Sequence, residues 1–439
     1  MLGVSLLDKP SYRYGLDERP PLGENLIFGL QWLAITVPLI IILGKIVAAS
    51  HFADPAAQIL YLQKLFFTTA VMLLIQVYRG HRLPLITGPA SVLLIGITAN
   101  AGSSIDAMYT ATIIGGGLLT LAGATGWLDH LKGLFPPRVV AVILLLIAFT
   151  LLPTIMNLII APGTGVSPPL HLLFSLAFLA VLVSISRVLT GLWKSTLIIW
   201  AMLAGSLVYF LVFSPAAVDM SGSAGAVPTF ASFFHEFTLH FSLEPALIVS
   251  FLFTYLALFI NDLGSMQSVG SMVGATEMQA RISRGVTVTG LMNILSGFLG
   301  VIGPVNFSLS PGVIASTRCA SRFTLAPTAI LLFLISFFPA VIHWLGNIPP
   351  VVIGTLLLYI MCAQVATGLR IIYESENPLS MDNGYIVGLP VLLGTVISFL
   401  PPAVTAGFPA MWRPILGNGF VVGVVAVLLL EHVLFRKKG

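Results

Sequence analysis

The stretch SLSPGVIASTR, residues 308–318, places a proline and a glycine, Pro311 and Gly312, in the middle of an apolar chain. Proline has no backbone N–H and is favoured at the first position of a helix. A second stretch, TGPAS at 87–91, has the same local chemistry around Pro89. We therefore expect an extended segment followed by a short helix at each place, with the two helices starting at Pro89 and Pro311.

The composition of the whole chain excludes a soluble globular protein. Of its 439 residues, 57% are hydrophobic and 8% are charged, and the mean hydropathy is +1.02. Soluble domains carry about 25% charged residues. The sequence therefore predicts an all-α polytopic membrane protein whose surroundings are the lipid bilayer. Its net charge of +4 does not indicate a nucleic acid partner, because the basic residues are dispersed between apolar runs.

Apolar runs bounded by charges, glycine and proline predict fourteen membrane spans. A helix needs about 20 apolar residues to cross a bilayer, and two of the runs, 84–99 and 307–320, are too short for that. These two runs contain the proline breaks. The predicted spans are 25–48, 56–78, 84–99, 107–127, 134–153, 171–190, 193–214, 244–272, 284–303, 307–320, 325–345, 350–368, 384–401 and 417–435.

The basic residues predict the orientation of the chain. With both termini in the cytoplasm, 17 of the 20 lysine and arginine residues fall on the cytoplasmic side of the spans, as the positive-inside rule requires. We expect a multi-pass protein of the cell inner (plasma) membrane, with cytoplasmic tails at 1–24 and 436–439. Both cysteines lie in or beside apolar segments without the spacing of a metal or redox pair.

An inverted repeat is the predicted organisation of the spans. The extracytoplasmic connection at 215–243 has no lysine or arginine and separates seven spans in 25–214 from seven in 244–435. An odd number of spans inserts the second half upside down relative to the first, as in many transporters. Because irregular backbone inside a membrane must be buried in protein, we expect the two extended segments to pair as a short sheet. The N-termini of the two half-helices would then converge on a substrate.

Further segments resemble the nucleobase-ascorbate transporter family, which includes the bacterial uracil and xanthine permeases. The resemblance implies a core domain of spans 1–4 and 8–11, a gate domain of spans 5–7 and 12–14, and a substrate bound between them. It also implies a homodimer and coupling to protons. The segments that carry it are GLQWLA at 29–34, LPLITGPAS at 83–91, LFPPRVVAVILLLIAFTLL at 134–152, PPVVIGTLLLYIMCAQVATGLR at 349–370, and the spacing of Gly312, Thr317 and Arg318.

The chain departs from that family at the positions that bind the polar groups of the substrate. The family signature begins with Glu or Gln followed by Asn, and the matching residues here are Leu309 and Ser310. The buried Glu of the eighth span is matched by Asn261, and the His that follows Gln in many first spans is Trp32. Either other side chains read a nucleobase, or the substrate is different.

Asp262 is the acidic residue well inside an apolar span, where an ionisable group is a functional hypothesis by default. We assign it to coupling, with a structural hydrogen-bonding role as the alternative. No cofactor is expected apart from a coupling proton or sodium ion, and no metal site. The expected substrate-binding residues, by resemblance or by position beside the breaks, are Gln31, Pro89, Ala90, Ser91, Asn261, Ser265, Phe307, Leu309, Ser310 and Gly312. For Gln31 and Phe307, a backbone hydrogen bond and plain packing are the respective alternatives.

The function hypothesis is secondary active transport of a nucleobase, such as uracil, xanthine or another purine or pyrimidine, by movement of core against gate. One alternative is a transporter of a small organic or aromatic anion, because no glutamate offsets the positive ends of the half-helices. A channel is the other. An enzyme is not expected, because the sequence has no clustered nucleophile, base or metal-ligand motif. All eight histidines fall in loops or at span ends, so no histidine relay is expected at depth.

Overall fold

The structure, a computed structural model, describes residues 12–100, 102–126, 136–161, 165–213, 228–234, 240–307, 309–373, 380–409 and 411–435. The first eleven residues of the predicted N-terminal tail, most of the connection at 215–243 and the C-terminal tail at 436–439 lie outside them. The described chain is mostly helical, as expected.

The first half of the chain begins with two long helices and then the first break. Its elements are α1 (Leu22–His51), α2 (Pro55–Tyr78), β1 (Thr87–Pro89), α3 (Ser91–Ala99), α4 (Ile105–Thr125), α6 (Pro137–Thr150), α7 (Leu152–Ile160), α8 (Pro168–Val188), α9 (Gly191–Ser195) and α10 (Leu197–Phe213).

The second half repeats this order of long helices, strand and short helix. Its elements are α11 (Pro245–Val273), α12 (Met278–Leu299), β2 (Pro304–Asn306), α13 (Ser310–Thr317), η2 (Arg322–Thr324), α14 (Leu325–Ile335), α15 (Pro339–Gly346), α16 (Pro350–Tyr373), α17 (Met381–Ser398), α18 (Pro402–Ala406), α19 (Arg413–Leu416), α20 (Gly419–Leu429) and η3 (Leu430–Leu434).

The helices support a multi-pass membrane protein. Among the described residues, eight are long and apolar enough to cross a membrane, and the count is nine if α14 and α15, bent by 101° at their junction, form one span. Every one of the fourteen predicted runs contains a helix. Helix α12, with 22 residues, is long enough but is not among these eight, and the other remaining helices have fewer than 18 residues. The count of fourteen and the division into seven and seven therefore stay predictions.

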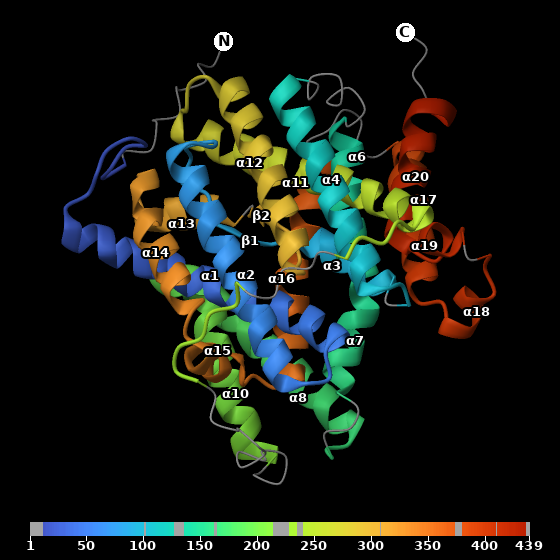
Figure 1. The fold of residues 1–439 in the computed structure, drawn as a ribbon, viewed down its shortest axis with the longest axis horizontal. Helices are drawn as coiled ribbons and strands as arrows, with labels where there is room; N and C mark the ends of the chain where they lie inside the picture. The colour runs from blue at the N-terminus through green and yellow to red at the C-terminus, as the bar shows by residue number, and fades with distance from the viewer. Residues whose placement is uncertain are drawn as a thin grey trace.

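The two extended segments pair with each other, as expected from the sequence. Strands β1 and β2 are antiparallel, with Thr87 opposite Asn306 and Pro89 opposite Pro304. The pairing continues beyond the strands, since the N–H of Phe307 donates to the carbonyl of Ile86 at 2.9 Å. Figure 1 shows this small sheet in the middle of the molecule, surrounded by helices.

The first half-helix starts later than predicted. Helix α3 begins at Ser91, and Pro89 is the last residue of β1. In this register the hydrogen-bonded pairs are 86 with 307 and 90 with 303, so Pro89 and Pro304 face each other at a position that needs no N–H donor. A proline therefore ends the strand without loss of a ladder bond. Pro311 lies in the first turn of α13, one residue after its start.

The helices pack as two sets. Helices α1, α2, α3, α4, α11, α12 and α14 pack on one another around the sheet, and α16 packs on α6, α7, α8 and α10, with α17 on α6 and α20. The first set contains helices of the spans predicted for the core, and the second contains helices of the spans predicted for the gate, while the division into these two domains stays a prediction. The sheet belongs to the first set.

The last part of the predicted N-terminal tail is bound to the core. Residue Tyr14 forms a parallel bridge with Cys319, directly after α13. The N–H of Arg13 donates to the carbonyl of Arg318 at 2.8 Å, and that of Ala320 donates to the carbonyl of Tyr14 at 2.9 Å. The end of the second half-helix is therefore held by a segment that precedes α1.

Candidate substrate-binding site

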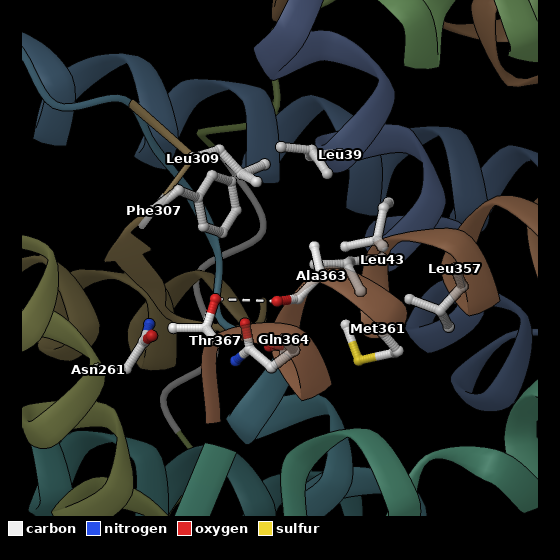
Figure 2. A pocket seen from close by; sticks show the side chains of 12 residues that line it. Leu39, Leu43, Asn261, Phe307, Leu309, Leu357, Met361, Ala363, Gln364 and Thr367 are labelled. Atoms are coloured by element: carbon white, nitrogen blue, oxygen red, sulfur yellow. Dashed lines mark hydrogen bonds between the residues drawn. The ribbon is translucent and has the colours of Figure 1, made fainter. Parts of the chain in front are cut away.

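A cavity of about 700 Å³, including its open mouth, lies beside the sheet and between the two helix sets. Figure 2 shows Phe307 and Leu309 across the cavity from Leu357 and Met361 of α16. The lining residues are Leu39, Leu43, Ser91, Asn261, Phe307, Leu309, Leu357, Ile360, Met361, Ala363, Gln364 and Thr367.

Four of the residues predicted from the sequence meet in this cavity. Ser91 is the first residue of α3, Asn261 lies on α11, and Phe307 and Leu309 both precede the start of α13 at Ser310. The two half-helices therefore do converge on one place. Neither N-cap residue, Ala90 or Leu309, gives its helix a side-chain hydrogen bond.

Two predicted hydroxyls are buried and hold the sheet instead of lining the cavity. Ser310 Oγ accepts from the N–H of Ile86 at 3.1 Å and lies 3.3 Å from the carbonyl of Phe307. Ser265 Oγ contacts the carbonyl of Asn306 at 3.1 Å. The Ser265 hydroxyl holds the backbone of Asn306, which precedes the lining residue Phe307. The Ser310 hydroxyl contacts the backbone of Phe307 itself.

The remaining predicted residues also lie outside the lining of this cavity. Pro89 and Ala90 are buried in the sheet and at the cap of α3. Gly312 is exposed on α13, with no atom within 4 Å of where its Cβ would be. Gln31 is half-buried, more than two helical turns before Leu39 on α1, and its Oε1 has no hydrogen-bond partner among the described residues. Their roles in binding stay predictions.

The ring of Phe307 is positioned by a glycine. A Cβ on Gly88 would lie 2.5 Å from Phe307 Cε2 and 2.7 Å from its Cζ. The ring therefore packs directly on the backbone of β1, in the space that any larger residue at position 88 would fill. Gly88 lets the aromatic face lie at the cavity wall.

Sequence reasoning missed the contribution of α16. Leu357, Ile360, Met361 and Gln364 follow one another at the spacing of one helical face. Helix α16 contributes two polar residues to the lining, Gln364 and Thr367. Thr367 Oγ1 donates to the carbonyl of Ala363 in the same helix at 2.9 Å (Figure 2), whereas the side chain of Gln364 has no hydrogen bond among the described residues. A lone glutamine on an apolar helical face was the available signal.

Asp262 is fully buried behind the sheet and is not a lining residue. Its Oδ1 accepts from Asn306, at 2.6 Å from Nδ2 and 3.3 Å from the backbone N–H, and its Oδ2 accepts from Thr289 Oγ1 at 2.8 Å. Gln76 Nε2 in turn donates to Thr289 Oγ1 at 3.2 Å. The donors from Asn306 and Thr289 point toward the carboxylate, which is the arrangement that suits its ionised form.

His81 completes this network, although the sequence analysis gave it no role. The loop between α2 and β1 turns inward, and the imidazole is fully buried. Its Nδ1 accepts from the N–H of Leu83 at 2.9 Å, so Nε2 carries the proton and donates to Asn306 Oδ1 at 3.1 Å. Burial lowers the pKa of His81 to about 3, and the imidazole is neutral at physiological pH.

Metal binding has no support in the described part of the chain. No three His, Cys, Asp or Glu side chains come together there in a way that could hold an ion. The cavity lining consists of apolar, hydroxyl and carboxamide side chains.

The chain is similar to known permeases over nearly its whole length. A model described as Permease family matches residues 23–403. The putative purine permease YwdJ of Bacillus subtilis is 24% identical over 427 residues, which cover 93% of this chain and 96% of the relative. The uric acid transporter UacT of Escherichia coli is 26% identical, covering 93% and 86% of the two chains. The xanthine permease XanP of Escherichia coli is 25% identical, covering 95% and 93%.

Solved structures share the fold at low sequence identity. The transmembrane domain of the cyanobacterial bicarbonate transporter BicA superposes with a TM-score of 0.55 at 16% identity, covering 86% of this chain and 96% of that one. Murine Solute Carrier 26 family member A9, in an inward-facing state, gives a TM-score of 0.59 at 12% identity, covering 94% and 69%. These likenesses establish a shared transporter fold and nothing about the substrate.

Proposed function

We propose, from the premise that this chain belongs to the permease family, that it is a secondary active transporter of purine nucleobases. Membership makes the protein a membrane transporter and not an enzyme. Full-length relatives named for purines, uric acid and xanthine favour a purine over uracil.

The observation that carries the proposal is the cavity at the two half-helices. It is walled by the flat ring of Phe307 and by apolar side chains, and it holds the polar side chains of Asn261 and Gln364. A base stacked on an aromatic ring gains about 1–3 kcal/mol, and polar groups at the rim of the ring fix its orientation. This combination suits a planar heterocycle with polar edges.

Alternating access is the proposed mechanism. The cavity has α1, α3, α11 and the start of α13 on one side and α16 on the other. Movement of the α16 set past the sheet set would expose the substrate to each side of the membrane in turn. The same proposal includes fourteen spans arranged as a 7+7 inverted repeat. It also places the protein in the inner membrane as a homodimer, with both termini on the cytoplasmic side.

Asp262 is the proposed coupling residue, with the proton as the coupling ion. Its two oxygens accept hydrogen bonds from Asn306 and Thr289. A proton on the carboxylate would add a donor where the neighbours are already donors, so Asn306 would have to turn away. Because Phe307 directly follows Asn306, this change would reach the cavity wall without contact between Asp262 and the substrate.

Transport by the purified protein in proteoliposomes tests this function. We expect saturable uptake of radiolabelled xanthine or urate that rises above equilibrium when the external medium is more acidic than the lumen. Exchange without a gradient should also occur. Absence of both uptake and exchange for every purine tested, with folded protein, would refute the proposal.

A small anion is the second candidate substrate. Its support is the absence of any acidic side chain among the twelve lining residues, together with the two uncapped half-helix N-termini. Competition of xanthine uptake by benzoate distinguishes the two. Binding of benzoate without binding of xanthine or urate would favour the anion.

A further inference from the structure

Two carboxamides in the cavity have no hydrogen-bond partner among the described residues. Asn261 and Gln364 both line the cavity and are both partly buried, and neither side chain has a hydrogen bond in the part of the chain that the structure describes. Buried polar groups in native proteins are nearly always bonded. Unpaired donors and acceptors at the wall of a cavity are groups that a ligand or water must satisfy.

Other buried amides in the same region are fully used. Asn306 bonds to Asp262 and His81, and Gln76 donates to the carbonyl of Gly285 at 2.9 Å. Asn293 donates to the carbonyl of Pro304 at 2.9 Å and accepts from a tyrosine hydroxyl. These amides stabilise the core, whereas the amides of Asn261 and Gln364 bond to no described residue.

The two free amides come from opposite helix sets. Asn261 lies on α11, which packs on α3, α4 and β2, and Gln364 lies on α16, which packs on α6, α7 and α8. Figure 2 shows the two side chains entering the cavity from these different helices. A ligand that bonds to both amides joins the two sets.

The chemistry of the pair selects the ligand. Each carboxamide presents one acceptor oxygen and one donor NH₂ side by side. A ligand edge that matches a carboxamide has an acceptor next to a donor. Asn and Gln form such a pair of hydrogen bonds with a nucleobase when they recognise DNA. A lactam, with N–H beside C=O, has this edge. A carboxylate offers acceptors only, so it could accept from the NH₂ groups but would leave each amide oxygen without a donor.

We propose that Gln364 is a specificity-determining residue that reads the substrate together with Asn261, and that the pair selects a planar heterocycle with lactam edges, such as an oxopurine. The inference rests on the proposed transport function and adds to it the residue on α16 and the ligand class. None of the twelve lining side chains ionises near neutral pH. The affinity for a ligand that does not itself ionise is therefore independent of pH at the reading site.

Binding of radiolabelled xanthine to the full-length protein in detergent tests the role of Gln364. An unpaired polar group costs about 1–3 kcal/mol, so Gln364→Leu should weaken binding about 5- to 150-fold. Gln364→Glu, which keeps the size and removes the donor, should weaken it in the same range. Thr395→Val is the matched control, because Thr395 lies on α17 outside the cavity lining and its hydroxyl is bonded within its own helix, to the carbonyl of Val391 at 2.7 Å. Its Kd should equal that of the wild type.

A second measurement separates loss of substrate recognition from loss of folding. Each N-methylated xanthine lacks one N–H because a methyl group replaces its hydrogen. The isomer that carries the methyl group on the nitrogen facing Gln364 should bind the wild type poorly. Gln364→Leu should lose this discrimination, while the melting temperature without ligand stays at the wild-type value. Benzoate should bind neither protein.

The outcomes are distinct. If wild type binds xanthine and both Gln364 variants bind it equally well with unchanged discrimination, the inference is overturned and the transport function stands. If folded wild type binds no purine, the proposed function itself fails. Weaker binding in both Gln364 variants, with binding by Thr395→Val unchanged, supports Gln364 as the residue that recognises the substrate.

Discussion

Replacement of Gly88 by alanine should damage substrate binding without touching the substrate. The new Cβ would lie 2.5 Å from Phe307 Cε2, which is far inside van der Waals contact. The strand backbone is paired on β2 and cannot retreat, so the phenyl ring must swing away from the cavity wall. Stacking of a base on an aromatic ring is worth about 1–3 kcal/mol, which corresponds to a Kd about 5- to 150-fold higher.

The assay is equilibrium binding of xanthine to purified wild-type and variant proteins, compared with Phe307→Leu. Because both changes remove the same stacked ring, the double variant Gly88→Ala/Phe307→Leu should bind no more weakly than Phe307→Leu alone. Gly117→Ala, on α4, is the control glycine, since nothing lies within 4 Å of its Cβ position, and it should bind as the wild type does. Wild-type affinity in Gly88→Ala, or full additivity in the double variant, would refute the assignment of Phe307 to the binding wall.

Three further predictions concern the buried network and the sheet. Asp262→Asn should leave xanthine exchange intact and abolish accumulation driven by a pH gradient, and unimpaired accumulation would remove Asp262 from coupling. Because the pKa of His81 is about 3 in the folded protein and 6.5 as the ordinary value, the unfolded state binds the extra proton between these values. The melting temperature should therefore fall as the pH drops below 6.5, and His81→Gln should make this slope shallower. Ser310→Ala leaves the N–H of Ile86 unpaired, so unfolding should become easier by about 1–3 kcal/mol, seen as a lower melting temperature in detergent.

The sequence predicted those parts of the fold that a single local rule determines. Proline and glycine breaks in short apolar runs predicted the sheet and both half-helices, because lipid does not tolerate unpaired backbone. Phe307 was placed near the site by its position before the second break, and Asn261 by the resemblance to the eighth span of the nucleobase-ascorbate transporter family. The predicted start of the first half-helix was wrong by two residues at Pro89, because a proline fits a helix start and a non-hydrogen-bonded strand pair equally well, and only the partner strand distinguishes them.

The features that escaped prediction depend on distant partners. Gln364 is separated from Asn261 by about a hundred residues and is one polar residue on an apolar helix. His81 was assigned to a loop, yet its loop turns inward and its bond to Asn306 spans 225 positions. Ser310 was expected to touch substrate, and its hydroxyl is bonded to the backbone of Ile86. None of these pairings has a periodicity or spacing that a single sequence displays.

The pairing of β1 with β2 also sets an order of events during synthesis. The two strands are separated by more than two hundred residues, and a ribosome adds roughly 5–20 residues per second. β1 therefore waits roughly 10 to 40 s after its own synthesis before its partner exists. During this interval its edge is unpaired, and neither half-helix can occupy its final position. The substrate site is thus among the last parts of the molecule to form, and a chain truncated before Pro304 cannot form it at all.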